Sequence, residues 1–370
     1  MSTIEPLSAE RKEAFIQLIA KHTGIEIRER DQASLGAKIF SRMNVLKLNS
    51  SIAYYQLLES STADSHQEWL DLVTLLTNGE SYFFRDKEQF SLLRNHILPE
   101  LIQRKQDSKT IRICSAGCSS GEEPYSIAIL LQELIPDLEQ WNLLILGVDI
   151  NQAALEKARD GVYSSWSFRS VDPNIKQQYF TLNNDRYKID QTIKEMVRFQ
   201  ILNLIKDELP QQDSDLRDMD LIICRNVFIY FERLAIAKVL NKFYHTLQPS
   251  GYLLTGHAEL SNQNLNLFQI KVFSESLVYQ RAEKDSASAS SSLRLDDFED
   301  CYPENLSHDA NHDTDSDPHT RRNIRMQQIA LNLLRQLPPD MTIQKLGNLT
   351  AAELILQLET ELKIIDQELS

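Results

Sequence analysis

Two consecutive glutamates, Glu122 and Glu123, follow a loop of small residues, and they limit the ligands that the loop can hold. The sequence from Ile111 to Tyr125, IRICSAGCSSGEEPY, predicts a short strand, a glycine-containing loop and the start of a helix. This corner binds nucleotides in doubly wound α/β sheets. The two carboxylates disfavour a phosphate at the helix start. The loop therefore favours a neutral or cationic adenosine cofactor over one with a pyrophosphate.

A third acid, Asp149, ends the apolar run Leu143–Val148, which predicts a buried parallel strand. An acid at this place accepts hydrogen bonds from ribose hydroxyls, although acids also cap the helices that follow strands. Together with the loop, Asp149 favours S-adenosylmethionine (AdoMet) as the cofactor. NAD is the rival, but the loop lacks the third glycine of the G-x-G-x-x-G pattern. These residues predict an AdoMet-dependent methyltransferase.

Polar residues also follow two later strands. Asn203 comes after the strand Val197–Leu202, and Arg225, Asn226 and Tyr230 come after a strand that ends at Cys224. Ligands bind at the carboxyl ends of strands in doubly wound sheets. We therefore expect these side chains to share one crevice with the glycine loop and Asp149.

The elements that must hold these residues fall into two predicted domains. Residues 1–86 form a small helical domain and a connector, since Ser8 caps a first helix that Gly24 ends. Residues 87–282 form a doubly wound α/β domain in which strands alternate with helices. An aromatic, irregular insertion is expected at residues 161–195.

The chain beyond these domains has a different composition. Residues 283–320 carry eleven Asp and Glu against two basic residues, which predicts a disordered acidic linker. Apolar spacing predicts helices at 321–337 and 351–369 within a helical C-terminal tail, 321–370. The sequence identifies no partner for this tail.

Composition disfavours several classes of protein. The formal net charge of −14 argues against general affinity for nucleic acid or anionic membranes. The four cysteines form no disulfide pattern, and neither a signal peptide nor an apolar run of membrane-spanning length is present. We expect a soluble cytoplasmic protein that does not insert into membranes. We also expect no metal site, because the tail histidines His308, His312 and His319 lie in the predicted linker.

One basic helix face is a candidate for protein binding. Lys38 and Arg42 lie four residues apart in the predicted helix Arg30–Leu46, so they share a face. Such a face is either simply solvated or a docking site for an acidic helix.

Several motifs together resemble one known family. They are TNGESYFFRD, SAGCSSGEEPYSIA, GVDIN, LEKARDGVY, ILNL, CRNVFIYF and GHAEL. In this order, from about Ser8 to Arg281, they resemble the CheR-type chemoreceptor glutamate O-methyltransferases. The resemblance implies a small helical domain before a Rossmann-like domain that uses AdoMet to methylate glutamates on acidic receptor helices, which Lys38 and Arg42 would then recognise. The alternatives are an AdoMet-binding adaptor and a methyltransferase with another acceptor.

The resemblance also implies the residues of the cofactor site. They are Gly79, Ser81, Arg85, Glu123, Asp149, Asn203, Leu204, Arg225 and Asn226. Ser81 and Arg85 would line the methionine end, with Glu123 near the amino group. Asp149 would bind the ribose.

The same resemblance places the remaining residues. Asn203 and Leu204 would frame the adenine, while Arg225 and Asn226 would lie beside the sulfonium. Arg85 and Tyr230 would be nearest to the transferred methyl and would hold and orient the acceptor carboxylate.

Two segments depart from the pattern of some relatives. Gly79 stands where many relatives have an asparagine, and Asn78 is displaced by one position. The insertion at 161–195 is more similar to relatives that do not grip a receptor peptide through a small β-subdomain.

Overall fold

The computed structural model describes the two predicted domains and short pieces of the tail. The described residues are 7–211, 214–257, 259–260, 263–273, 275–282, 331, 342–343, 349–350, 352–353, 355–356 and 358–359. The predicted linker 283–320 and most of the tail lie outside them. Within the tail, Thr342–Ile343 (β11) and Leu349–Thr350 (β12) pair antiparallel, which the all-helical prediction did not anticipate. No helix among the described residues is long and apolar enough to span a membrane.

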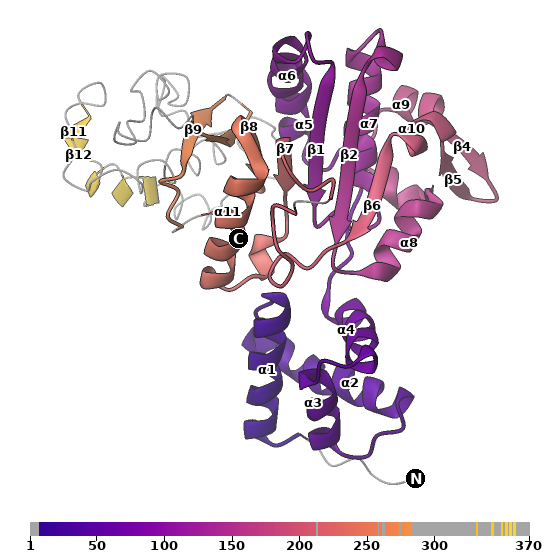
Figure 1. The fold of residues 1–370 in the computed structure, drawn as a ribbon, viewed down its shortest axis with the longest axis vertical. Helices are drawn as coiled ribbons and strands as arrows, with labels where there is room; N and C mark the ends of the chain where they lie inside the picture. Colours follow the sequence, from indigo (N-terminus) through magenta and orange to yellow (C-terminus); the bar gives the residue numbers. More distant parts are fainter. Residues whose placement is uncertain are drawn as a thin grey trace, which may run out of the picture.

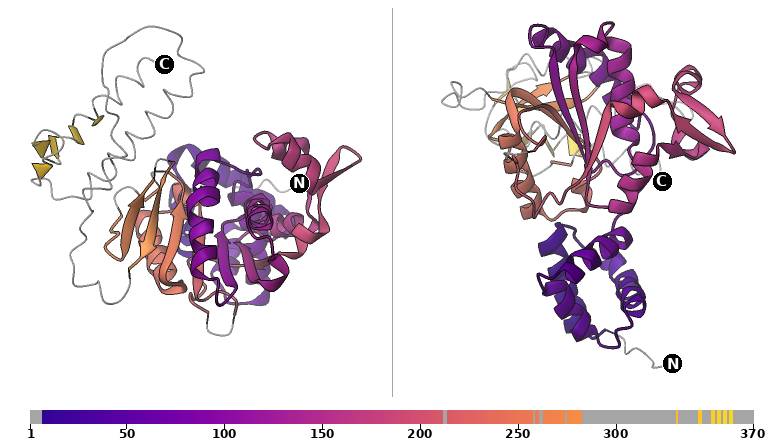
Figure 2. Two further views of the ribbon diagram at one scale, coloured as in Figure 1. Left: turned by 90° about the horizontal axis from the view of Figure 1, so that it is seen from above. Right: turned by 45° about the vertical axis from the view of Figure 1, so that its right-hand side comes forward.

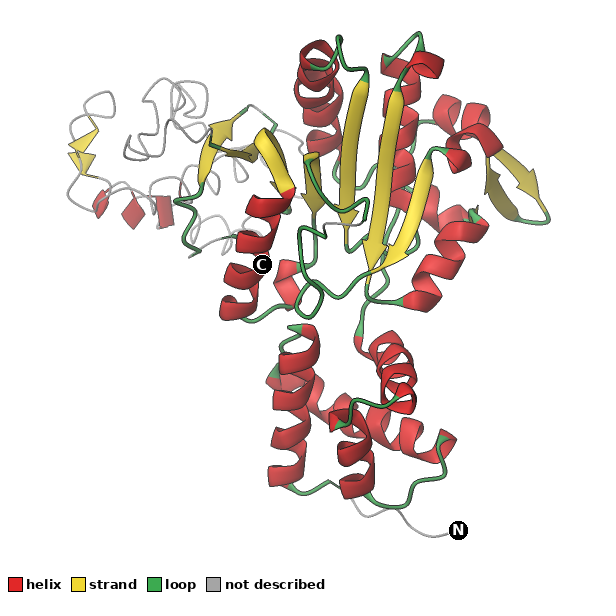
Figure 3. Ribbon diagram, in the orientation of Figure 1, coloured by secondary structure: helices red, strands yellow, loops and turns green. Residues whose placement is uncertain are grey.

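The N-terminal domain is helical, as predicted, and lies below the sheet in Figures 1 and 3. Its helices are α1 (Ala9–Thr23), α2 (Glu29–Val45), α3 (Ser51–Glu59) and α4 (Ala63–Leu76). The Ser8 side chain accepts a hydrogen bond from the Arg11 amide at the start of α1, and Gly24 ends the helix at φ 79°. Phe15, Ile19 and Ile39 pack in the interior.

Arg42 is not available as part of a docking face, and this part of the prediction is wrong. Its guanidinium donates two hydrogen bonds to Glu68, at 3.0 and 2.7 Å, and pairs with Asp71. Glu68 is only 2% exposed and also accepts a hydrogen bond from the Tyr54 hydroxyl at 2.6 Å. Since a buried carboxylate needs a partner, the Arg42 charge ties α2 to α3 and α4. Lys38 stays half-buried on α2, outside this network.

Replacing Arg42 by alanine should lower the free energy of unfolding of the helical domain by roughly 3 kcal/mol, because it leaves the buried Glu68 carboxylate without its cation. Urea denaturation followed by circular dichroism measures the change. Lys38→Ala is the control and should change the same quantity by less than about 0.5 kcal/mol. Equal effects of the two variants would contradict the structural role of Arg42.

The second domain is built on a seven-stranded sheet with the order β6-β2-β1-β7-β8-β10-β9. In chain order its strands are Thr110–Ala116 (β1), Asn142–Asp149 (β2), Val197–Ile201 (β6), Met219–Cys224 (β7), Leu247–Thr255 (β8), Phe268–Val272 (β9) and Leu277–Arg281 (β10). The first five strands in the sheet order are parallel, while β10 pairs antiparallel with β8 and β9. This is the predicted Rossmann-like sheet, with an antiparallel hairpin of β9 and β10 at one edge.

Helices cover both faces of this sheet, and each face has its own hydrophobic core. The main helices are Lys87–Leu92 (α5), Leu98–Arg104 (α6), Glu122–Leu134 (α7), Gln152–Asp160 (α8) and Arg233–Thr246 (α11), with one π-helical segment, Leu93–Ile97, between α5 and α6. Among the described residues, short 3-10 helices also span Leu138–Gln140, Ser165–Phe168 and Phe228–Tyr230. Ile111 and Ile113 of β1 pack with residues of α5 to α7, whereas Cys114 and Ala116 pack with residues of α11. Side chains of β1 are therefore buried on both faces of the sheet, as expected for a central strand. The carboxyl end of β1 is directed at the helical domain (Figure 1).

The insertion at 161–195 forms a small β-subdomain, so the expectation of an irregular segment without such a subdomain is wrong. Its elements are Val162–Tyr163 (β3), Pro173–Tyr179 (α9), Phe180–Asn183 (β4), Arg186–Ile189 (β5) and Gln191–Glu195 (α10). The strands form an antiparallel sheet in the order β3-β5-β4, which projects from the side of the domain in Figure 2. Sequence periodicity missed these strands because they are only two to four residues long.

The helical domain contacts the loop after β7 directly. Ile25 forms an antiparallel bridge with Phe231, and the Glu26 amide donates to the Tyr230 carbonyl at 2.8 Å. The Arg28 guanidinium donates to the Ile229 carbonyl at 2.7 Å. The chain just after α1 therefore holds the backbone of the segment that carries Tyr230.

Candidate active site

The glycine loop is fastened to the end of β2. Gly117 has φ +76°, and a Cβ there would lie 2.3 Å from Val227, so only glycine fits this turn. The amides of Gly117 and Cys118 donate to the Val148 carbonyl at 2.8 and 3.0 Å. Small residues thus allow β1, β2 and the loop after β7 to meet closely.

Asp149 lies at the end of β2 beside this loop. Its carboxylate accepts the Ser119 amide on one oxygen and the Asn151 amide on the other, both at 2.8 Å. Burial raises the pKa of Asp149, and these amides oppose the shift by stabilising the charged form. Each oxygen has a second lone pair for a ligand in the cavity.

The two glutamates of the loop have different environments. Glu122 is buried and accepts hydrogen bonds from the Ser120 and Ser167 hydroxyls, while burial raises its pKa. It does not line the cavity. Glu123 does line it, and its carboxylate accepts the Ser115 hydroxyl at 2.7 Å.

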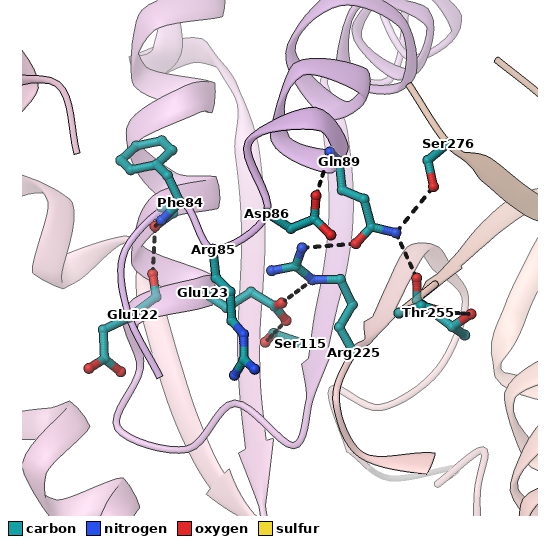
Figure 4. Close-up of polar contacts among 12 residues, drawn as sticks. Phe84, Arg85, Asp86, Gln89, Ser115, Glu122, Glu123, Arg225, Thr255 and Ser276 are labelled. Atoms are coloured by element: carbon teal, nitrogen blue, oxygen red, sulfur yellow. Dashed lines mark hydrogen bonds and ion pairs between the residues drawn. The ribbon is translucent and has the colours of Figure 1, made fainter. Parts of the chain in front are cut away.

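Arg225 is held in a polar network, shown in Figure 4. Its Nε donates to Glu123 at 2.7 Å and its Nη1 to Gln89 at 2.9 Å. Gln89 in turn donates to the Thr255 carbonyl and the Ser276 hydroxyl. With a side chain only 3% exposed, Arg225 is fixed in place and its charge is balanced by Glu123.

Arg85 has a different environment. Its Nη1 donates to the Glu80 carbonyl at 3.0 Å, and within the described part of the chain it forms no ion pair with a carboxylate. Phe84 and Asp86 on either side have φ of 54° and 69°, and the Phe84 amide donates to the Ser126 hydroxyl. This unusual backbone, with Phe84 buried, directs Arg85 to the cavity, beside the Arg225 network in Figure 4.

Tyr230 is 39% exposed at the cavity, and its hydroxyl is 3.5 Å from the Asn78 amide nitrogen. Glu259 lies near the same loop, and the Gly256 amide donates to it at 2.8 Å. Burial raises the pKa of Glu259 to about 7, while the amides of Asn226 and Ile229 favour its charged form. Glu259 belongs to the GHAEL motif, but no local sequence pattern predicts that it lies next to this loop.

These residues surround an open cavity at the carboxyl ends of the parallel strands. Nine of the ten predicted site residues line it: Gly79, Ser81, Arg85, Glu123, Asp149, Leu204, Arg225, Asn226 and Tyr230. Asn203 does not. Its side-chain amide donates to the His22 carbonyl, and its oxygen accepts the Ile205 amide. Sequence reasoning missed Ile25, Ile150 and Asn151, which also line the cavity.

The lining fits AdoMet. Val148, Ile150 and Leu204 offer apolar surface for a flat ring, and Asp149 offers acceptors for hydroxyl groups. Glu123, whose charge Arg225 balances, offers carboxylate oxygens as hydrogen-bond acceptors near the other end. The predicted cofactor is thereby consistent with the residues present.

Comparison with known proteins identifies the family. Residues 79–276 match the family model described as "CheR methyltransferase, SAM binding domain", and residues 12–77 match "CheR methyltransferase, all-alpha domain". A chemotaxis protein methyltransferase of Borreliella burgdorferi is 33% identical over 68% of this chain and 89% of its own length. The chemotaxis protein methyltransferase 2 of Vibrio cholerae is 32% identical over 76% of this chain and 96% of its own length. The two matched domains coincide with the helical domain and the AdoMet-binding domain of the structure, and the chain belongs to the CheR methyltransferase family.

Proposed function

We propose that the chain is a protein-glutamate O-methyltransferase that forms γ-methyl esters on methyl-accepting chemoreceptors or similar signalling proteins. The observation that carries this proposal is the contrast between the two arginines of the cavity. Arg225 is neutralised by Glu123, whereas Arg85 donates to a backbone carbonyl and, within the described residues, pairs with no carboxylate. An arginine in this state is suited to bind the carboxylate of an acceptor. The names of the relatives, chemotaxis protein methyltransferases, support a chemosensory role.

The chemistry needs alignment rather than a general base. Bound AdoMet supplies an electrophilic methyl group on a sulfonium. A glutamate side chain is ionised at pH 7 and can act as the nucleophile without losing a proton. Arg85 would hold this carboxylate by charge-assisted hydrogen bonds, and the Tyr230 hydroxyl would orient it. The surrounding residues would remove part of its water.

The remaining cavity residues have proposed roles in holding AdoMet. Asp149 would accept hydrogen bonds from the ribose hydroxyls, and Leu204 would pack against the adenine. Glu123, with Ser81, would bind at the methionine end. Asn203 would act indirectly, because its side chain braces the turn that carries Leu204. Arg225 and Asn226 would lie beside the sulfonium, with Arg225 positioning Glu123.

Incubation with labelled AdoMet and membranes that contain candidate receptors tests this function. The expected result is base-labile label on receptor glutamates. Label on another acceptor would indicate a methyltransferase of different specificity. Cofactor binding without any transfer would favour an AdoMet-binding adaptor.

Lys38 is the remaining candidate for a receptor contact on α2, since Arg42 is paired internally. Lys38→Glu should raise the KM for receptor several-fold by repelling an acidic helix, while the Kd for AdoMet stays unchanged. The effect should shrink at high ionic strength. An unchanged receptor KM at low salt would remove Lys38 from the docking surface.

A further inference from the structure

Two aromatic rings and two guanidinium groups lie against one another in series at the rim of the cavity. We call Trp166, Arg169, Tyr82 and Arg85 the rim stack. The Arg169 Cζ atom lies 4.6 Å from the Trp166 ring centre and 3.6 Å from that of Tyr82. The Arg85 Cζ atom lies 5.6 Å from the same Tyr82 ring. Tyr82 and Arg85 line the cavity, so the stack leads from the site outward to Trp166.

The outer end of the stack is an exposed tryptophan on a rigid support. Trp166 is 65% exposed, although its neighbours Ser167 and Phe168 in the same short helix are buried. The Phe83 amide donates to the Ser167 carbonyl at 3.0 Å, and the Phe168 ring packs on Phe83 at 5.1 Å. The support is therefore continuous with the connector that carries Arg85. A fixed but exposed tryptophan is typical of a surface that binds a partner.

The charges of the stack select the partner. Arg169 pairs with Glu80 at 2.9 Å, and this contact holds its guanidinium between the two rings. Arg85 has no such carboxylate within the described residues, so the stack and Glu80 together have a net positive charge. Arginine, tyrosine and tryptophan are the residue types that most often dominate binding energy at interfaces. The combination suits a segment that offers carboxylates together with an apolar side chain.

The spacing suits a helix. Neighbouring groups of the stack are 3.6 to 5.6 Å apart, so the Arg85 guanidinium and the Trp166 ring are at most about 14 Å from each other, which corresponds to between two and three helical turns of about 5.4 Å each. A helix that places one glutamate at Arg85 can therefore place residues of its next turns over Arg169 and Trp166.

We infer that the rim stack is the acceptor-docking surface of the AdoMet-binding domain, and that it binds the acidic helical segment flanking the target glutamate. Trp166 takes an apolar side chain of that segment and Arg85 takes the target carboxylate, while Arg169, whose charge Glu80 balances, holds the Trp166 and Tyr82 rings in place. This inference rests on the proposed function, because it assumes a protein acceptor. Under this inference the insertion, together with the helical domain, determines which acceptor protein is methylated.

The test is steady-state methylation of receptor-containing membranes by the full chain with labelled AdoMet. Trp166→Ala should raise the KM for receptor on the order of 10-fold, with kcat and the Kd for AdoMet within about twofold. Trp166→Phe should recover most of the loss. Leu234→Ala is the matched control, since Leu234 is an 83% exposed apolar residue on α11, and should leave the receptor KM unchanged.

Arg169→Ala and Arg169→Lys extend the test to the cation, and their melting temperatures show whether the insertion still folds. A folded Arg169→Ala variant should raise the receptor KM, and lysine should restore part of it. Unchanged receptor KM values for both Trp166→Ala and a folded Arg169→Ala would overturn the rim stack while leaving the proposed function intact. No base-labile label with the unsubstituted chain would overturn both.

Discussion

Replacing Arg85 by alanine should lower kcat for receptor methylation on the order of 100-fold or more, while AdoMet still binds. The guanidinium is directed into the cavity by the buried Phe84 and by the left-handed backbone at Asp86. Without it, the acceptor carboxylate loses the cation that would hold it in line with the methyl group. Removing a preorganised donor from the reacting group has effects of this size in other enzymes. Single-turnover transfer from labelled AdoMet measures the chemical step directly.

Two variants separate this role from a general loss of structure. Arg85→Lys keeps the charge but not the planar fork, so its activity should lie between those of the wild type and the alanine variant. Arg159→Ala is the matched control, because Arg159 is exposed on α8 and likewise donates to a backbone carbonyl, that of Phe199. Full activity of Arg85→Ala would eliminate the proposed acceptor contact.

The sequence predicted the parallel strands and the cavity at their carboxyl ends because both depend on local signals. An apolar run such as Leu143–Val148 has the composition of a buried strand whatever surrounds it. The residue that ends such a strand, here Asp149, must lie at the edge where ligands bind. Nine of the ten predicted residues line the cavity. Most of them either follow a strand or belong to the motif TNGESYFFRD in the connector between the domains.

Partners from distant parts of the chain were not predictable in this way. Arg42 and Glu68 are separated by 26 positions, so helical spacing showed a basic face but not the carboxylate that packs against it. Asn203 also follows a strand, yet its side chain bonds to the His22 carbonyl in the other domain. A pattern within one element shows which face is polar, but not which element covers that face.

The contacts of Arg169 with Trp166 and Tyr82 were not predictable for the same reason. The segment SSWSFRSVDP has the composition of an aromatic loop, and the three-residue spacing of Trp166 and Arg169 does not show that the guanidinium also lies against Tyr82. That contact depends on the connector packing against the insertion through Phe83 and Phe168.

Replacing Asp149 by alanine should raise the Kd for AdoMet on the order of 100-fold. The change removes the acceptor proposed for the ribose hydroxyls, and also the carboxylate that receives the Ser119 and Asn151 amides. Hydrogen bonds to a charged group contribute about 1.5–3 kcal/mol each, so the loss of one or two accounts for this factor. Isothermal titration calorimetry measures the affinity.

The amide variant distinguishes loss of charge from loss of shape. Asp149→Asn keeps one oxygen acceptor but turns an amide donor toward either the Ser119 or the Asn151 N–H, so it should also weaken binding, by less than alanine does. Asp160→Ala is the matched control, because Asp160 is an exposed acid at the end of the helix that follows Asp149. If Asp149→Ala bound AdoMet as tightly as Asp160→Ala, the ribose contact would have to lie elsewhere in the lining. Because Ser119 belongs to the glycine loop, Asp149 links the two features from which the cofactor was predicted, and its replacement tests both together.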